Sequence, residues 1–336
     1  MKDEIKKSST VNSDQDQKHQ LDASPQVVGR RNFLKTSAGA AVLGASVLVG
    51  VGKAFAQDMV IPTPDWKTLK PGKHDSDLYA EQSGYNDTDV TSWDGRNVFG
   101  ITIGLVQMRV NLPMIPGNMG NASTFDFPML YREMNADNVF DVMANPPSKN
   151  FTDGIVEAAQ WLELQGVRAI MGNCGFFGSY QNVVRKQINV PFFSSSQMML
   201  PMMVQSMPAN KKVGVITANG PILKKVQAIQ NCGLSLEDKK NRIVVMGCEE
   251  YPEFATGIMA NTGRYNPNKV EKEIVSVAER MLVANKDIGA ILLECTELSP
   301  HAVAVQNAVR MPVWDYTTLT KWIQSGCVRR PFVGHV

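Results

Sequence analysis

Two short stretches, Ala169–Gly175 (AIMGNCG) and Ala290–Thr296 (AILLECT), decide the fold because they look like copies of one another. In each, an apolar run leads to a cysteine, and an Ala-Ile pair stands five and four residues before that cysteine. A proline follows seventeen residues after each cysteine, at Pro191 and Pro312, and opens another apolar run. Cysteines at matching points of an internal repeat predict two thiols that face each other across one pocket.

From Val98 onward, apolar runs alternate with amphipathic helical runs, and the pattern starts again at residues 212–217. Continuous apolar runs such as 98–106 are typical of parallel strands that are buried on both faces. We therefore predict an α/β fold with two similar three-layer lobes, mostly parallel sheets and a pseudo-twofold relation between the lobes. Active sites of such sheets lie at the carboxyl ends of strands, so we expect the site in the cleft between the lobes.

The predicted elements can be given by their ranges. Strands are expected at 98–106, 169–174, 191–195, 212–217, 242–246, 288–295 and 312–316. Helices are expected at 152–166, 180–187, up to about 207, and at 222–232, 268–284, 301–309 and 319–325. We assign 98–210 to the first lobe, completed by about 300–336, and 211–299 to the second. A long polar and glycine-rich loop at 116–128 is of the kind that often carries function.

Residues 1–56 are interpreted as an export signal. A polar leader precedes Arg30–Lys35 (RRNFLK), a mild Ala/Gly/Val run follows, and Ala54–Ala56 resembles a cleavage site. The apolar run is too short and too rich in Ala and Gly for a good membrane span. The paired arginines resemble a twin-arginine signal, which predicts cleavage near Ala56, the twin-arginine export machinery as a partner, and a periplasmic location. Residues 57–97 are predicted to form an arm or linker.

Composition and charge argue against several classes of function. The 336 residues are 43% hydrophobic and 20% charged, which is ordinary for a globular protein. The net charge of +2 gives no support for a nucleic-acid or membrane-surface partner, so we expect a small-molecule substrate. No His/Cys/Asp cluster has metal-ligand spacing, so neither a metal nor a cofactor is expected. Five cysteines cannot all pair within one chain, and oxidation after export leaves open whether the two repeated cysteines stay free.

The repeated cysteines, Cys174 and Cys295, have the chemistry of an acid and a base. A helix that begins directly after a strand offers free N–H groups and its positive dipole end, which lowers the pKa of a thiol. A thiolate removes a proton and a thiol returns one, so two such groups on opposite faces of a carbon invert it without a cofactor. Hydroxyls at neighbouring strand ends are candidates for binding the carbanion that forms: Ser194, Ser195, Thr217, Thr296 and Thr317.

The sequence around these cysteines resembles the aspartate/glutamate racemase superfamily. Glu294–Glu297 (ECTE) is similar to the Gly-Cys-Thr-Glu/His motif in the second half of that family, and Asn173–Gly175 stands where the family has its first catalytic cysteine. Residues 212–217 look like its second-lobe opening strand, and the resemblance covers about 98–325. It implies a homodimer, and it implies roles for the following residues: Cys174 and Cys295 as acid/base thiols, Thr217 and Thr296 as carboxylate ligands, and Glu297 as the group that orients or tunes Cys295.

The sequence departs from that family around Cys174. Amino-acid racemases have Cys-Asn-Thr there, whereas residues 174–177 read CGFF, and Val106–Arg109 lacks the usual polar pair. The 116–128 loop also differs, and its Asn118 and Asn121 are candidate substrate contacts. The two aromatic residues indicate a bulkier or less polar substrate, such as a hydantoin, an arylmalonate-like acid or another 2-substituted acid.

We therefore expect a cofactor-independent racemase or epimerase that inverts a carbon next to a carboxylate or carbonyl. A decarboxylase or cis–trans isomerase of the same superfamily is an alternative, although the presence of both thiols weakens the decarboxylase. The other alternative is an exported solute-binding or sensing protein that has the fold without catalysis.

Overall fold

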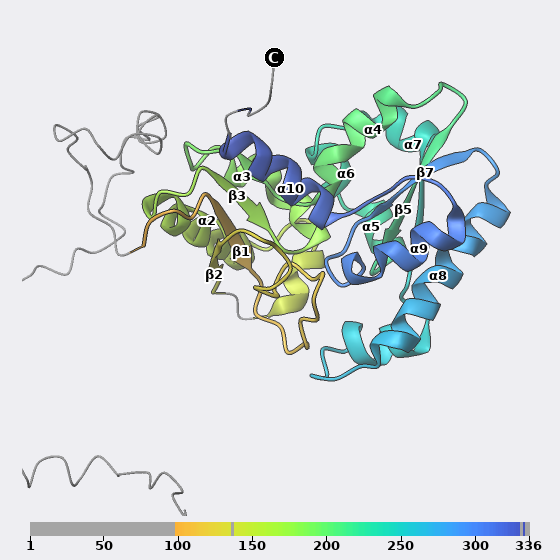
Figure 1. Cartoon of the computed structure of the whole chain (residues 1–336), viewed down its shortest axis with the longest axis horizontal. Coiled ribbons are helices and arrows are strands. Elements are labelled where there is room, and N and C mark those ends of the chain that lie inside the picture. Colours follow the sequence, from red (N-terminus) through yellow and green to blue (C-terminus); the bar gives the residue numbers. More distant parts are fainter. Residues whose placement is uncertain (1–97, 136–137, 330–331, 333–336) are drawn as a thin grey trace, which may run out of the picture. The chain divides into compact units, whose positions relative to one another are not determined.

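The structure is a computed structural model that describes residues 98–135, 138–329 and 332. The predicted export signal at 1–56 and the predicted arm at 57–97 lie outside these residues. Among the described residues, no helix is long and apolar enough to cross a membrane. The described chain has two halves, each built on a parallel sheet with helices packed against it (Figure 1).

The first sheet contains four parallel strands in the order β2-β1-β3-β4. They are β1 (Ile103–Gln107), β2 (Met129–Glu133), β3 (Ala169–Gly172) and β4 (Phe192–Phe193). The side chains of β1 and β3 are almost entirely buried, as the continuous apolar runs predict. Cys174 follows the carboxyl end of β3, one of the two central strands of this sheet.

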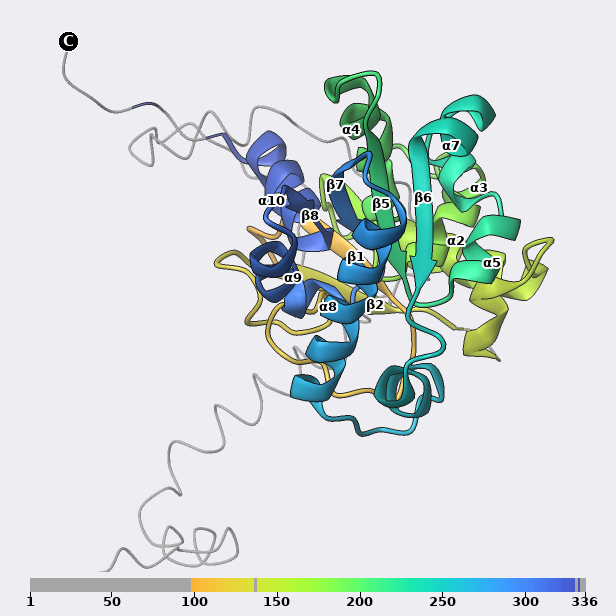
Figure 2. The ribbon, with the colours of Figure 1, turned by 90° about the vertical axis from the view of Figure 1, so that its right-hand side faces the viewer.

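The second sheet repeats this arrangement with the order β6-β5-β7-β8, again with parallel strands (Figure 2). Its strands are β5 (Lys212–Thr217), β6 (Ile243–Gly247), β7 (Ile288–Leu293) and β8 (Val313–Trp314). Cys295 follows β7, which has the same place in this order as β3 has in the first. The predicted α/β fold with two similar lobes and parallel sheets is confirmed.

The helices cover both faces of each sheet. Figure 1 shows α8 and α9 on one side of the second sheet and α4 and α7 on the other. The helices and helical turns have these bounds: η3 Val139–Met143, α2 Lys149–Leu164, η4 Gly175–Tyr180, α3 Gln181–Val184, η5 Ser196–Met199, α4 Leu200–Ser206, α5 Gly220–Lys225, α6 Ala228–Asn231, α7 Leu236–Arg242, η6 Phe254–Met259, α8 Pro267–Ala284, η7 Ser299–His301, α9 Ala302–Val309 and α10 Tyr316–Cys327.

The last helix, α10, returns to the first half. The Thr320 hydroxyl lies 3.3 Å from the sulfur of Met171 in β3. On the other face of this sheet, α2 packs its Leu162 against Gly104 of β1. Gly104 pairs with the residue before Met171, and neighbours along a strand point to opposite faces, so α2 and α10 cover opposite faces. The strand before α10, β8, lies in the second sheet, although residues 300–336 were predicted to complete the first lobe.

Several elements differ from the prediction; the helix α7 and the helical turn η3, for example, were not predicted. The predicted helix at 222–232 is two short helices, because Val226 has an extended backbone and buries its side chain. The strand β2 was not predicted; its side chains are only half-buried and show no alternation of apolar and polar residues. The segment η6 is a π-helix, a form without a distinct sequence period.

Candidate active site

The carboxyl ends of β3 and β7 lie against each other. They continue as two cysteine loops, which we define as Asn173–Gly175 and Glu294–Glu297. The Thr296 hydroxyl lies 2.9 Å from the carbonyl oxygen of Asn173, across 123 residues of chain. The internal repeat thus brings both cysteines to one place, with one loop from each half of the molecule.

Both repeated thiols are buried, with 8% of Cys174 and 7% of Cys295 exposed. They are close enough that a charge on Cys174 raises the pKa of Cys295. None of the five cysteines, all of which lie in the described part of the chain, forms a disulfide. The two thiols therefore share one buried environment.

Burial raises the pKa of both thiols above the ordinary value for cysteine. At Cys174 burial is the largest cause, and Glu294 adds to it, while the backbone N–H groups that follow act in the opposite direction. At Cys295 burial is again the largest cause, and Glu297 adds to it. The prediction of lowered thiol pKa values is therefore wrong. The N–H groups act at Cys174 as expected, but burial and carboxylate charge outweigh them.

Glu297 is the hydrogen-bond acceptor beside Cys295. Its Oε2 lies 3.0 Å from the Cys295 sulfur and 2.9 Å from the Thr296 hydroxyl. The amide Nδ2 of Asn118 lies 3.3 Å from its Oε1. The single proton of the Thr296 hydroxyl goes either to Glu297 or to the Asn173 carbonyl. The thiol already donates its hydrogen bond to a carboxylate, so Glu297 is placed to take that proton.

Glu294 is a site residue that the sequence reasoning missed. Its carboxyl group is fully buried and accepts hydrogen bonds from the Thr217 hydroxyl at 2.8 Å and from the Gln197 amide at 2.9 Å. Burial is the main reason why its pKa rises to about 7. A carboxylate directly after an apolar strand was the available signal, because the strand end places it beside the cysteine.

Three residues predicted to bind substrate have other partners. The Thr217 hydroxyl donates to Glu294 instead of facing open space. The hydroxyls of Ser194 and Ser195 lie 3.7 and 3.8 Å from the sulfur of Cys232, and both serines are fully buried. These three hydroxyls thus have partners within the protein, and the Thr296 hydroxyl contacts Glu297 beside Cys295.

The loop between β1 and β2 contains two predicted substrate contacts, Asn118 and Asn121, and only Asn118 reaches the candidate site. Asn118 is buried and reaches Glu297, as described above. Asn121 stabilises the loop, because its Nδ2 donates to the carbonyl of Met114 at 2.6 Å and its Oδ1 accepts from the Ser123 N–H at 2.9 Å. The two asparagines therefore differ: one contacts the Cys295 side of the site and the other shapes the turn.

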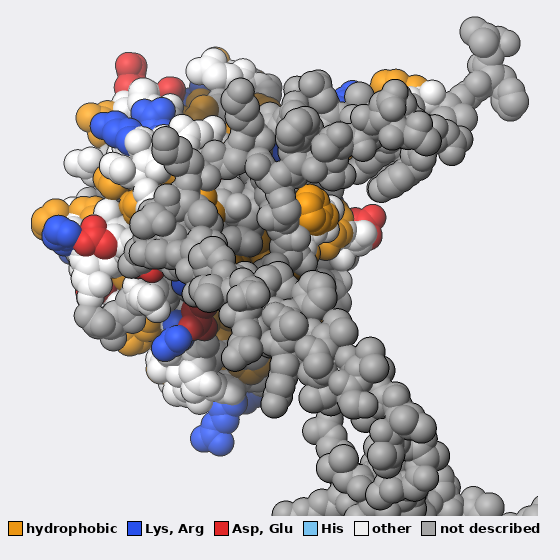
Figure 3. Space-filling model, turned by 90° about the vertical axis from the view of Figure 1, so that its left-hand side faces the viewer, with side chains coloured by type: hydrophobic (Ala, Val, Ile, Leu, Met, Phe, Trp, Pro, Cys, Tyr) orange, Lys and Arg blue, Asp and Glu red, His pale blue; other side chains and the backbone are white. Residues whose placement is uncertain are grey.

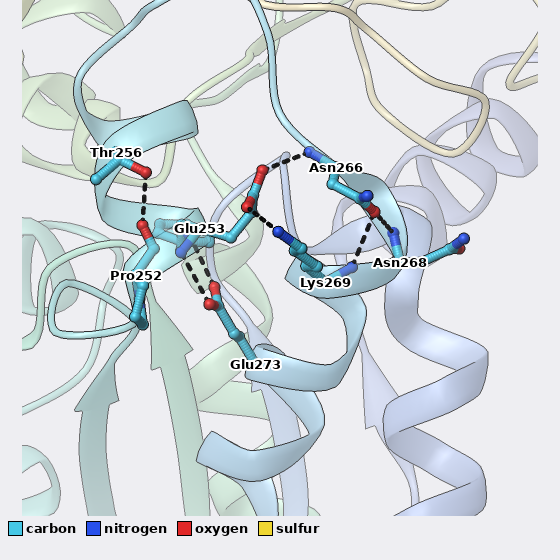
Figure 4. A network of polar contacts seen from close by, with 8 residues as sticks. Pro252, Glu253, Thr256, Asn266, Asn268, Lys269 and Glu273 are labelled. Carbon is cyan, nitrogen blue, oxygen red and sulfur yellow. Dashed lines mark hydrogen bonds and ion pairs between the residues drawn. The ribbon is translucent and has the colours of Figure 1, made fainter.

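A segment of the second half, residues 252–266, contacts the same loop, and Figure 4 shows how its ends are fixed. The N–H groups of Glu253 and Phe254 each donate to the Glu273 carboxylate at 2.8 Å. The Asn266 N–H donates to Glu253 at 2.7 Å. Between these anchors, the Tyr265 hydroxyl donates to the carbonyl of Pro113 at 3.1 Å. The loop of the first half that carries Asn118 is thus bound by a segment of the second half whose two ends are fixed by hydrogen bonds.

The charged forms of the groups that affect the pKa values of the two thiols and of Glu294 are negative. Within the described part of the chain, the charged groups with the largest effects on the pKa values of Cys174, Cys295 and Glu294 are carboxylates and thiolates. No group of three His, Cys, Asp or Glu side chains among the described residues could hold a metal ion. On the face drawn in Figure 3, the visible described side chains of both charge signs are interspersed. The ionisable groups that act on the two thiols are therefore themselves acids.

The chain is similar in sequence to several lyases. Dimethylsulfoniopropionate lyase 3 of Emiliania huxleyi (strain CCMP1516) is 30% identical over 239 residues, which cover 69% of this chain and 61% of that protein. Dimethylsulfoniopropionate lyase 7 of the same strain is 30% identical over 223 residues, covering 65% and 64%. The dimethylsulfoniopropionate lyase of Durusdinium sp. clade D is 26% identical over 241 residues, covering 71% and 79%. The chain thus spans about three fifths of the length of the first of these relatives, and no protein-family model matches it.

Solved structures with a similar fold include a glutamate racemase and a decarboxylase. Glutamate racemase from Aquifex pyrophilus has a TM-score of 0.44 and 19% identity, covering 68% of this chain and 84% of that one. Unliganded arylmalonate decarboxylase has a TM-score of 0.45 and 16% identity, covering 70% and 98%. The α/β fold with two parallel sheets is established by the strand pairings of this chain itself. The relatives named above are lyases that are 26% to 30% identical to it over the matched residues.

Proposed function

We propose that this chain is a lyase that cleaves dimethylsulfoniopropionate or a close 3-sulfonio acid. The observation that carries the proposal is the similarity to proteins with that name, at 30% identity over 239 residues. The acidic surroundings of the two thiols support it, because a sulfonium group is a permanent cation. The racemase expected from the sequence is thereby replaced as the first candidate.

The proposed reaction is an elimination. A base removes a proton from the carbon next to the carboxylate. The electron pair of that C–H bond forms a carbon–carbon double bond, and the bond from the next carbon to sulfur breaks. Dimethyl sulfide leaves with the bonding pair and is neutral, and the remaining three-carbon product is acrylate. The proton stays on the enzyme until it is released to water, so atoms and charge balance.

Cys295 is the base in this proposal, with Glu297 as the group that takes up its thiol proton. The pair is already in hydrogen-bond contact, at 3.0 Å. In the free protein, burial and the carboxylate keep the thiol protonated. A bound sulfonium cation has the opposite effect on the pKa, since a nearby positive charge favours the thiolate. The Cys295 thiolate, which is the base, therefore forms only when the substrate is bound.

Cys174 has a different role in the proposed elimination. Its pKa is raised mainly by burial, and no described side chain is placed against it as Glu297 is against Cys295. A protonated thiol donates a hydrogen bond, so Cys174 is suited to stabilise the charge that develops on the substrate carboxylate when the proton leaves. Elimination needs only one base, which leaves the second thiol free for this task.

The test is a product assay with the purified protein. Dimethylsulfoniopropionate is supplied, dimethyl sulfide is measured in the headspace by gas chromatography, and acrylate is measured in solution by NMR. We expect equal amounts of the two products. Cys327→Ser is the control for cysteine substitution as such, and we expect it to form both products. Cys327 lies at the end of α10 and is only half-buried. The absence of both products with the native protein would exclude the proposal.

A second candidate, racemisation or epimerisation, is favoured by the matched positions of the two thiols after β3 and β7. A two-base mechanism exchanges the α-proton of a chiral acid with solvent. Amino acids, hydantoins and other 2-substituted acids in D₂O separate the two candidates. Deuterium at the α-carbon with inversion, and without release of dimethyl sulfide from the sulfonio acid, would establish the racemase in place of the lyase.

A further inference from the structure

The side chain of Tyr316 carries a hydroxyl that takes no part in the proton transfers assigned to Cys295 and Glu297. It is fully buried, and its hydroxyl has no hydrogen-bond partner among the described residues. A buried hydroxyl without a partner destabilises a folded protein, because it has lost its hydrogen bonds to water. Such a group is therefore a candidate for contact with a ligand.

Tyr316 belongs to an element other than the two cysteine loops. Tyr316 follows β8 directly and begins α10, where Asp315 caps the helix by accepting from the Thr318 N–H at 2.9 Å. The ionisable groups whose charges act on the Tyr316 hydroxyl include Cys174, Cys295 and Glu294. The hydroxyl is therefore coupled electrostatically to the groups of the candidate active site, and it follows the carboxyl end of a strand that pairs with β7.

Two other tyrosines among the described residues have partners for their hydroxyls within the protein. The Tyr180 hydroxyl, on a side chain that is also fully buried, donates to the carbonyl of Asp141 at 3.0 Å. The Tyr265 hydroxyl donates to the carbonyl of Pro113 at 3.1 Å. The missing partner at Tyr316 is therefore a property of that position and not of tyrosines in this fold.

We propose that Tyr316 is a catalytic residue whose hydroxyl donates a hydrogen bond to the carboxylate of the bound substrate. This inference rests on the proposed function, since it names the binding group for the acid end of that substrate. The carboxylate needs neutral donors in this site, because the charges with the largest effects around it are negative. When the α-proton leaves, negative charge grows on the carboxylate, so the same hydrogen bond strengthens in the transition state.

The first test is the variant Tyr316→Phe in the full chain. It removes one oxygen and keeps the ring, so the packing of the buried side chain is retained. We expect kcat/KM for dimethyl sulfide release to fall by about 10²-fold, the effect of losing one donor to a developing oxyanion. The melting temperature is expected to stay the same or rise, because the hydroxyl has no partner to lose. A kcat/KM within twofold of the native value would overturn the inference.

Tyr180→Phe is the matched control, because it removes an equally buried hydroxyl that does have a partner. We expect this variant to melt at a lower temperature and to keep its kcat/KM. A larger drop in melting temperature for Tyr316→Phe than for Tyr180→Phe would contradict the inference, since it would mean that the Tyr316 hydroxyl has a structural partner.

The last arm separates this inference from the proposed function. Propionate and acrylate are added separately, and the shift in melting temperature is measured for the native chain and for Tyr316→Phe. We expect both acids to raise the melting temperature of the native chain and to do so less for the variant. That result without any release of dimethyl sulfide would exclude the lyase and keep the carboxylate site. Equal shifts in both proteins would overturn the carboxylate site.

Discussion

At the scale of single residues, Glu294 makes the stability of the protein depend on pH. Its pKa is about 7 in the folded chain against an ordinary value of 4.5, mainly because of burial. The folded protein therefore holds this proton to higher pH than the unfolded chain does. The stabilisation from the raised pKa is present in full below about pH 4.5 and is lost as the pH rises through 7.

The variant Glu294→Gln removes this titration and keeps the size of the side chain. We expect the difference in unfolding free energy between the native chain and the variant to change by about 3 kcal/mol between pH 4.5 and pH 8, with the native chain becoming relatively less stable. Urea unfolding at several pH values measures this. A difference that stays constant with pH would mean that Glu294 does not titrate in this range.

The position of the Glu294 carboxylate requires that residue 175 has no side chain. A Cβ on Gly175 would lie 2.0 Å from the Glu294 carboxyl group, which is held by Thr217 and Gln197 and cannot move away without losing them. The racemase motifs that the sequence resembles have Asn and Gly at these two positions, in place of Gly and Glu. The carboxylate of Glu294 thus occupies the space that a side chain at residue 175 would need.

A double-mutant cycle tests this dependence. Gly175→Ala alone is expected to destabilise the chain by about 1–3 kcal/mol through overpacking. With Glu294→Gly in the background, the same change is expected to cost much less, so the two effects are non-additive. Chemical denaturation of the two single variants and the double variant gives the coupling energy, and additive effects would refute the proposed contact.

At the scale of elements, β1 and β5, which have the same place in the two sheets, each contain a glycine that faces a helix. A Cβ on Gly104 of β1 would lie 3.0 Å from a methyl of Leu162 in α2, and 3.2 Å from its Cβ. A Cβ on Gly214 of β5 would lie 2.5 Å from the sulfur of Met281 in α8. The same small residue at the same place in each half lets a helix pack closely on each sheet.

Alanine at these glycines is expected to have unequal effects. Gly104→Ala meets Leu162 close to the helix backbone, which cannot shift without moving α2, so we expect a loss of about 1–3 kcal/mol. Gly214→Ala meets the flexible end of Met281 and is expected to cost less. Gly326→Ala in α10 has open space around it and is expected to stabilise the chain by up to about 1 kcal/mol. Thermal unfolding of the three variants gives the order, and a larger loss for Gly214→Ala would contradict the packing described here.

The elements that could be predicted from the sequence are those with a strong period or an unbroken apolar run. The strand at 212–217 has the predicted bounds, and α8 begins one residue before the predicted 268. The strand β2 and the π-helix at 254–259 could not be predicted, because neither has a period that distinguishes it from a loop. Elements of this kind are selected by packing against other parts of the chain and not by their own sequence.

At the scale of the whole molecule, the site depends on contacts between residues far apart in sequence. The two cysteines could be predicted because the repeat marks them. The partners of Glu294 are 77 and 97 residues away, so its burial and its raised pKa could not be read from its neighbours. Tyr316 follows β8, which pairs with β7. The sequence therefore predicted that the two thiols and Glu297 lie together, but not that Glu294 is buried beside them.

The export of the chain stays a prediction, since residues 1–56 lie outside the described residues. If the paired arginines form a twin-arginine signal, replacing Arg30 and Arg31 with lysine should keep the protein in the cytoplasm. Fractionation of cells that express the native chain or the double variant measures this. The double variant in the periplasm at the native level would show that another route exports the chain.

The central claim is that Cys295, with Glu297 beside it, takes the proton that starts the elimination. The most direct measurement is kcat/KM for dimethyl sulfide release by Cys295→Ser and Cys174→Ser. We expect Cys295→Ser to lose about 10²–10⁴-fold, as for removal of a general base. We expect Cys174→Ser to lose about tenfold or less, because its hydroxyl still donates one hydrogen bond. Activity of Cys295→Ser within tenfold of the native chain, with a larger loss in Cys174→Ser, would contradict this account.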